Sequence, residues 1–194
     1  MRRLLLTLTL TGVLAVSMNG QSQTDIYEGY LVTKNNYRLT GYIGSIDIDD
    51  RGTQIRFVND FGTPYKIYPA LIKGFVFYQG PMMQAYESKY YRNHWMFLSV
   101  EYSGENVRLL RTPDKQSAYS RSINREVKRY WLETPGLGVV PIPRIGFRRY
   151  MRKIISEVSP ELARQIGKSG YRFKNLYDIM AAFDSESGQD KRRL

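Results

Sequence analysis

The sequence predicts an α+β protein, in which an antiparallel β barrel or sandwich of about eight to ten strands precedes a short helical C-terminal segment. Two regions of different composition and residue spacing predict this class. Residues 25–140 are rich in Tyr, Ile, Val, Thr and Gly, and turn residues separate their short apolar runs, as in a β domain. Residues 145–184 instead carry apolar side chains at helical spacing. A chain of 194 residues suffices for one domain with a small appendage.

The chain begins with the pattern of a secretory signal peptide. Two arginines precede an apolar run from Leu4 to about Val16, which is too short for a permanent membrane helix. The small residues Ala15 and Ser17 predict cleavage after residue 17, with a site as late as residue 22 as the alternative. We therefore expect an exported protein, periplasmic or associated with the cell surface. Because the chain has no cysteine, disulfides cannot stabilise it and thiolate metal sites are excluded.

The predicted strands are short segments bounded by turn residues. TQIRFV and YKIYP alternate polar and apolar side chains, which is typical of a strand with one buried and one solvated face. LIKGFVFY is more continuously apolar and indicates a central, covered strand. The polar stretch from Asp114 to Asn124 predicts a loop, and a short extended piece lies between Pro141 and Pro143. The predicted strands cover residues 28–33, 37–48, 53–58, 65–69, 71–78, 84–91, 95–102, 107–111 and 127–133.

The stretch FRRYMRKIISEV, residues 147–158, predicts an amphipathic helix. Its apolar residues recur at the spacing of one helix face, so we expect this face to pack on the rest of the protein. Its cations occupy the opposite face, where we expect solvent. Contact with anionic lipid or lipopolysaccharide is the alternative, and nucleic acid is disfavoured as the partner of an exported protein. The apolar residues are Phe147, Tyr150, Met151, Ile154, Ile155 and Val158, and the cations are Arg148, Arg149, Arg152 and Lys153.

Two further helices are predicted. Ser159-Pro160-Glu161 has the residue types of an N-cap, a first helical position and an acidic first turn, and Gly167 ends this helix. Asn175 is expected to cap a third helix, and 185–194 to form a flexible tail. Residues 144–194 hold twelve basic and six acidic residues, so the net charge of +11 is concentrated here.

Several catalytic and metal-binding patterns fail in this sequence. The segment from Asp47 to Val58 lacks two of the oxygen ligands of an EF-hand, so we expect a hairpin turn instead. His94 is the only histidine, and no nucleophile motif accompanies it, so we expect a loop or interface residue. We therefore predict no catalytic residue, no metal and no cofactor. A pair of glycosidase carboxylates cannot be identified, because the sequence does not show which carboxylates converge among Glu87, Glu101, Glu126 and Glu133.

Aromatic and cationic residues crowd residues 84–95. Such a mixture can stack bases, grip sugars or form a protein interface. Packing across strands is the alternative, since aromatic residues favour strands. The hypothesis of a ligand or partner surface, with a protein or glycan of the envelope as partner, concerns Tyr86, Tyr90, Tyr91 and Trp95.

The order of these features carries a resemblance. A signal peptide precedes "GYLVTKNNYRLTGYI", "IRFVNDFGTPYKIYPALIKGFVF", "YWLE…GLGVVPI" and the tail "FRRYMRKIISEVSPELARQIGKSGYRFKNLYDIMAAF". This order resembles a group of exported, uncharacterised proteins common in Bacteroidetes. The tyrosine–x–proline step before an apolar strand, at residues 68–77, and the Pro-x-Leu step at 160–162 are typical of the group. The resemblance implies export and this architecture, and it supplies no catalytic residue.

These observations favour a non-catalytic exported binding or assembly protein of the bacterial envelope. The alternatives are an exported hydrolase acting on glycan or peptide, and a cationic protein that associates with anionic lipid or lipopolysaccharide. An aromatic-lined cleft with converging carboxylates would favour the hydrolase. An exposed apolar strand or helix face would favour the interaction protein. An outer-membrane barrel is disfavoured because the predicted strands are short and charged.

Overall fold

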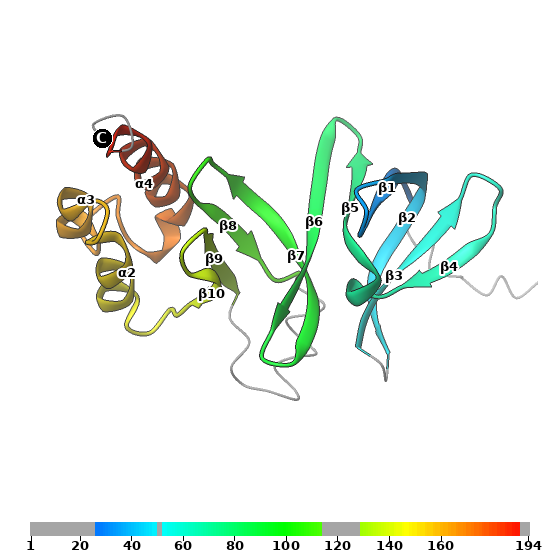
Figure 1. Cartoon of the computed structure of the whole chain (residues 1–194), viewed down its shortest axis with the longest axis horizontal. Coiled ribbons are helices and arrows are strands. Elements are labelled where there is room, and N and C mark those ends of the chain that lie inside the picture. Colours follow the sequence, from blue (N-terminus) through cyan, green and yellow to red (C-terminus); the bar gives the residue numbers. More distant parts are fainter. Residues whose placement is uncertain (1–25, 50–51, 114–128, 191–194) are drawn as a thin grey trace, which may run out of the picture.

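The computed structural model describes residues 26–49, 52–113 and 129–190. They form a ten-stranded antiparallel sheet, curled into a half-barrel, with short helices after its last strand (Figure 1). The predicted α+β class is therefore confirmed. The predicted signal peptide and the loop from Asp114 to Asn124 lie outside the described residues.

The strands follow the segments that the turn residues and the alternation predicted, and every bound agrees to within three residues. The strand predicted at 127–133 differs most, because it begins at Tyr130. The short extended piece before Pro143 is a full strand that pairs with it. The strands are β1 (Tyr27–Thr33), β2 (Arg38–Asp49), β3 (Gly52–Asn59), β4 (Pro64–Ile67), β5 (Ile72–Gln79), β6 (Met82–Tyr91), β7 (His94–Ser103), β8 (Arg108–Arg111), β9 (Tyr130–Thr134) and β10 (Gly138–Ile142).

One connection departs from a simple meander. The spatial order is β10-β9-β8-β7-β6-β5-β1-β2-β3-β4, so the chain returns from the edge strand β4 to place β5 beside β1. The short 3-10 helix η1 (Pro69–Leu71) makes this return, and its Pro69 is buried. The return brings Val76 opposite Tyr30 and joins two hairpins that are distant in sequence.

The sheet buries apolar side chains on both faces. Strands β1, β2, β3, β5 and β7 share a cluster of buried residues that includes Leu31, Phe75 and Phe97. Leu98 follows Phe97 on β7 and therefore points to the other face, where it packs with Leu110 and Trp131. The Trp131 indole N–H donates to the Thr112 hydroxyl (2.8 Å), which satisfies the polar atom of this buried ring.

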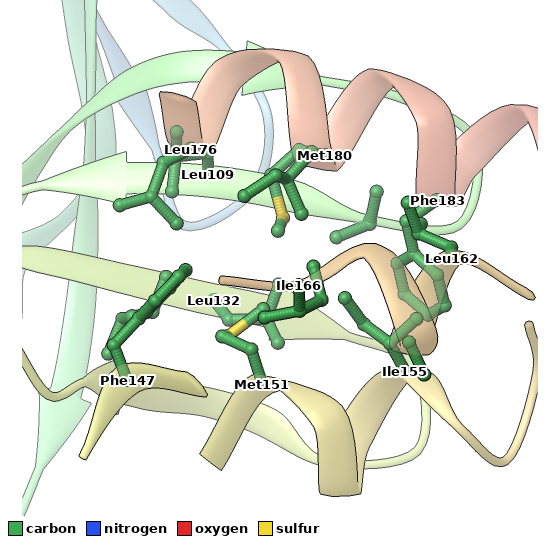
Figure 2. Packing of buried hydrophobic residues seen from close by; sticks show 14 residues of the cluster. Leu109, Leu132, Phe147, Met151, Ile155, Leu162, Ile166, Leu176, Met180 and Phe183 are labelled. Atoms are coloured by element: carbon green, nitrogen blue, oxygen red, sulfur yellow. The ribbon is translucent and has the colours of Figure 1, made fainter. Parts of the chain in front are cut away.

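A third cluster lies where the helices cover β8, β9 and β10 (Figure 2). The helices are α2 (Phe147–Ile155), α3 (Pro160–Gln165) and α4 (Leu176–Asp190), with a 3-10 turn η2 (Phe173–Asn175) before α4. Met151 and Ile155 are fully buried, and Figure 2 shows them pointing toward Ile166 and Leu162 between the helices. The expected packing of the α2 stripe on its own protein is thus observed at its centre.

The outer positions of the stripe are less buried than the pattern predicted. Tyr150 and Ile154 are half-buried, and Val158 is 38% exposed. The reason is that α2 ends at Ile155, so Val158 no longer lies on the helical face.

The capping predictions have mixed outcomes. Ser159 caps α3 as predicted, accepting a hydrogen bond from the Leu162 N–H (3.2 Å). The predicted cap Asn175 instead belongs to η2, and its buried side-chain oxygen has no hydrogen-bond partner in the described part of the chain. The end predicted for the last helix at 184 is wrong, because α4 continues to Asp190. The turns after 184 contact the rest of the protein, since Ser187 is buried and the Glu186 carboxylate accepts from the Ser159 hydroxyl.

Asp184 fastens α4 to the turn between β7 and β8. Its carboxylate accepts the backbone N–H groups of Asn106 (2.6 Å) and Glu105 (3.0 Å) and the Tyr102 hydroxyl (3.2 Å). A Cβ at Gly104 would overlap this carboxylate, so the turn needs glycine at that position for close approach. The contact connects residues about 80 positions apart and fixes the helices on the sheet.

Candidate functional site

The predicted aromatic surface is divided between the two faces of the β6–β7 hairpin. Tyr86 packs against the cluster that includes Phe75 and Phe97, and its ring is stacked on that of Phe75 with centroids 4.8 Å apart. Tyr91 lies on the opposite face, where its ring edge meets Trp131 at 5.0 Å. Both residues therefore have packing partners within the protein, because adjacent strand positions alternate between faces.

Tyr90 and Trp95 remain as an exposed aromatic pair. They are direct cross-strand partners, with ring centroids 5.3 Å apart and exposed fractions of 54% and 42%. The Lys34 ammonium lies 4.5 Å from the centre of the Trp95 ring, a cation–π distance. Of the four predicted residues, these two form one surface.

His94 begins β7 directly after the hairpin turn. Its Nδ1 lies 2.9 Å from the Arg92 carbonyl oxygen, and its side chain is exposed. Arg92 and Asn93 have φ angles of 45° and 68°, the left-handed conformation of a two-residue hairpin turn. His94 is therefore the first residue of a strand, next to a turn, rather than part of the expected loop.

The four cations of α2 are not equivalent. Arg152 is half-buried and donates to the carbonyl oxygens of Ala163 (3.1 Å) and Arg164 (3.4 Å), near the C-terminus of α3. A cation at a helix C-terminus stabilises the unpaired carbonyl groups there. Arg148 is exposed, although its aliphatic stem would meet a Cβ at Gly167. Arg149 and Lys153 are exposed, so the solvated cationic face is narrower than predicted.

Two of the four candidate carboxylates converge on the face of the sheet that carries Leu98 and Trp131. Glu87 and Glu133 both pair with Lys89, at 2.9 and 2.5 Å, and both pair with Arg108, at 3.1 Å for Glu133. Glu101 belongs to a different group, where it accepts from the Arg111 guanidinium (2.7 Å). Glu126 lies outside the described residues.

The converging pair is an ion-pair network rather than an acid–base site. Burial alone would raise the pKa of Glu87, but hydrogen bonds and charge from Arg108 and Lys89 hold that pKa below its ordinary value. A glycosidase general acid requires the opposite, a carboxyl whose pKa is raised. The geometry therefore does not favour the hydrolase alternative at Glu87 and Glu133.

A groove that the sequence analysis did not predict crosses β1, β2 and β5. It is open, holds about 260 Å³, and has Gly29 and Gly41 as direct cross-strand partners at its base. The same register places Glu28 opposite Tyr42 and Tyr30 opposite Thr40. Side chains on this face line the groove, namely Glu28, Tyr30, Thr40, Tyr42, Asp60 and Tyr78.

The groove exposes aromatic rings beside carboxylates. Tyr42 is 48% and Tyr78 is 45% exposed, and neither hydroxyl has a hydrogen-bond partner among the residues that the structure describes. Asp60 accepts from the Thr40 hydroxyl (2.5 Å). Within the described ranges, neither Asp60 nor Glu28 pairs with a cation. Unlike Glu87 and Glu133, these two carboxylates are exposed and form no ion pair within the described ranges.

The glycines at the base of the groove are visible in the sequence. The steps "EGY" at 28–30 and "TGY" at 40–42 share a glycine–tyrosine pair in neighbouring strands. A Cβ at Gly29 would overlap the Val76 carbonyl oxygen, and one at Gly41 would overlap that of Val58, so close strand approach requires glycine at both. The side chains missing at these two positions would point away from the groove, toward Phe77 and Phe57 on the opposite face of the sheet. The glycines therefore permit close strand packing behind the groove.

In the described segments no helix is long and apolar enough to cross a membrane. The same segments hold no cluster of three or more histidine, aspartate or glutamate side chains suited to a metal ion. Comparison with protein-family models, with curated proteins and with solved structures found no match to this chain.

Proposed function

We propose that this protein is a non-catalytic binding protein of the bacterial envelope, exported by its N-terminal segment, and that the groove across β1, β2 and β5 is its binding surface. The main observation behind this proposal is that Tyr42 and Tyr78 are exposed next to Glu28 and Asp60. These two carboxylates have no ion-pair partner among the described residues.

The physical argument concerns unsatisfied interactions. Tyrosine offers a large rigid apolar ring with a polar tip, which suits it to binding surfaces. Tyr86 and Tyr91 instead pack on Phe75 and Trp131. The exposed Tyr90 and Trp95 contact each other, and Lys34 lies over the Trp95 ring. Tyr42 and Tyr78 have no ring partner of this kind within the described residues. A ligand would therefore find stacking surface and hydrogen-bond acceptors in the groove.

Site-specific photocrosslinking in the native envelope tests this function. A photoreactive phenylalanine analogue replaces Tyr42 or Tyr78, and the matched control replaces Tyr177, which is 57% exposed on α4. We expect positions 42 and 78 to yield the same discrete adduct and position 177 to yield none of it. Equal labelling from all three positions, or no adduct from the groove, would refute the proposal.

A further inference from the structure

We infer that the groove binds a cationic side chain, lysine or arginine, of a partner polypeptide. This inference rests on the proposed function and names the ligand class of the same site. Two negative charges and three tyrosine rings in one open groove are the combination that attracts an ammonium or guanidinium group.

The protein itself shows this chemistry at the groove. The Arg38 guanidinium lies 4.8 Å from the centre of the Tyr30 ring, so one tyrosine that lines the groove already holds a cation. Tyr42 and Tyr78 have no such cation among the described residues, although their rings are about half exposed. The two rings are therefore open to a second cation, supplied from outside.

The size of the groove points to one side chain rather than a larger molecule. Its volume of about 260 Å³ lies just below the range of about 300–1,000 Å³ that drug-sized ligands occupy. The groove is open, so a polypeptide can lie across it and insert a single side chain. Asp60 and Glu28 then supply the compensating charge, which sugars do not need.

The charge distribution along the chain is consistent with this assignment. The high net charge of +11 would repel a cationic partner over most of the surface. However, twelve of the basic residues fall in 144–194, beyond the strands that form the groove. Residues 26–79 carry six basic and five acidic residues and are nearly neutral. The distant basic residues are screened from the groove, because the Debye length is about 8 Å at physiological salt. The charges near the groove are then those of Glu28, Asp60 and the Arg38 that lies on Tyr30.

Titration of the full chain with two small probes tests the inference. N-acetyl-arginine amide presents the guanidinium, and N-acetyl-citrulline amide is its neutral isostere. We expect the arginine probe to shift the amide NMR signals of Gly29 and Gly41, and the citrulline probe to bind about tenfold more weakly or less, as the loss of a cation–π and charge contact requires. Raising the salt concentration should weaken the arginine probe alone.

Matched variants locate the charge. The double variant Glu28→Gln with Asp60→Asn should bind the arginine probe about tenfold more weakly, whereas Glu157→Gln with Glu161→Gln, on the exposed helical side, should not change it. Equal binding of both probes, shifts only outside the groove, or preferential binding of a neutral oligosaccharide such as maltohexaose would each overturn the inference. If groove crosslinks persist while the arginine probe fails, the proposed function stands and this ligand class falls.

Discussion

Replacing Asp184 should separate the helices from the sheet more effectively than any other single polar change. This carboxylate accepts two hydrogen bonds from the β7–β8 turn and one from Tyr102 of β7, and the shortest comes from the backbone of Asn106, a buried residue. Hydrogen bonds to charged groups contribute about 1.5–3 kcal/mol each, and three bonds to one carboxylate are not additive. We expect Asp184→Asn to lower the free energy of unfolding by about 2 kcal/mol.

The pH dependence gives a second readout of the same contact. Burial by itself would raise the pKa of Asp184. The N–H groups of Asn106 and Glu105 and the Tyr102 hydroxyl together lower the pKa by more than burial raises it, so it lies below its ordinary value of 3.8. A carboxyl whose pKa is lower in the folded protein stabilises it above the ordinary pKa, and this contribution is lost as pH falls through the folded value. The stability difference between the original protein and Asp184→Asn should therefore shrink on acidification.

Denaturant unfolding from about pH 6 to about pH 2.5 measures both effects. Asp178→Asn is the matched control, since Asp178 is exposed on the same helix and should change stability only through the helix dipole, by about 0.3–1 kcal/mol. Tyr102→Phe removes one of the three donors and should cost about 0.5–1.5 kcal/mol. A constant difference across this pH range, or equal costs for positions 184 and 178, would refute the reasoning.

The remaining predictions address the core, the ion pairs, the histidine and export. Ile155→Ala should cost about 2–5 kcal/mol in denaturant melts, whereas the exposed Lys153→Ala should cost less than about 0.5 kcal/mol; equal costs would contradict the buried stripe. Glu87→Gln should destabilise the protein near neutral pH and flatten its acid transition below about pH 4.5, because the pKa of Glu87 is lowered in the folded state; an unchanged acid transition would argue against the ion pairs. His94→Ala should keep the fold and any hydrolytic rate, and a hundredfold loss would overturn this expectation. Mass spectrometry of the envelope protein should show a shortened N-terminus, which an intact Met1 would contradict.

Local patterns in the sequence determined the elements. Turn residues and alternation placed the strands, and the Ser159-Pro160-Glu161 step placed the start of α3, because backbone caps and turns depend on adjacent residues. The spacing of Phe147, Met151 and Ile155 determined the buried face of α2, since helical periodicity fixes which side chains share a face. The end of α4 was missed, because its last turns depend on tertiary packing around Ser187.

The tertiary structure alone decided which elements meet. Alternation assigns a side chain to one face of its strand, but it does not say which strand lies beside it. Only the pairing of β5 with β1 brings Tyr78 to Tyr30 and Tyr42. Arg108 likewise pairs with both Glu87 and Glu133, and the Asn106 N–H donates to Asp184, although these residues are distant in sequence. Neither the groove nor the ion pairs follow from local sequence, because each is made by long-range pairing whose register the whole sheet sets.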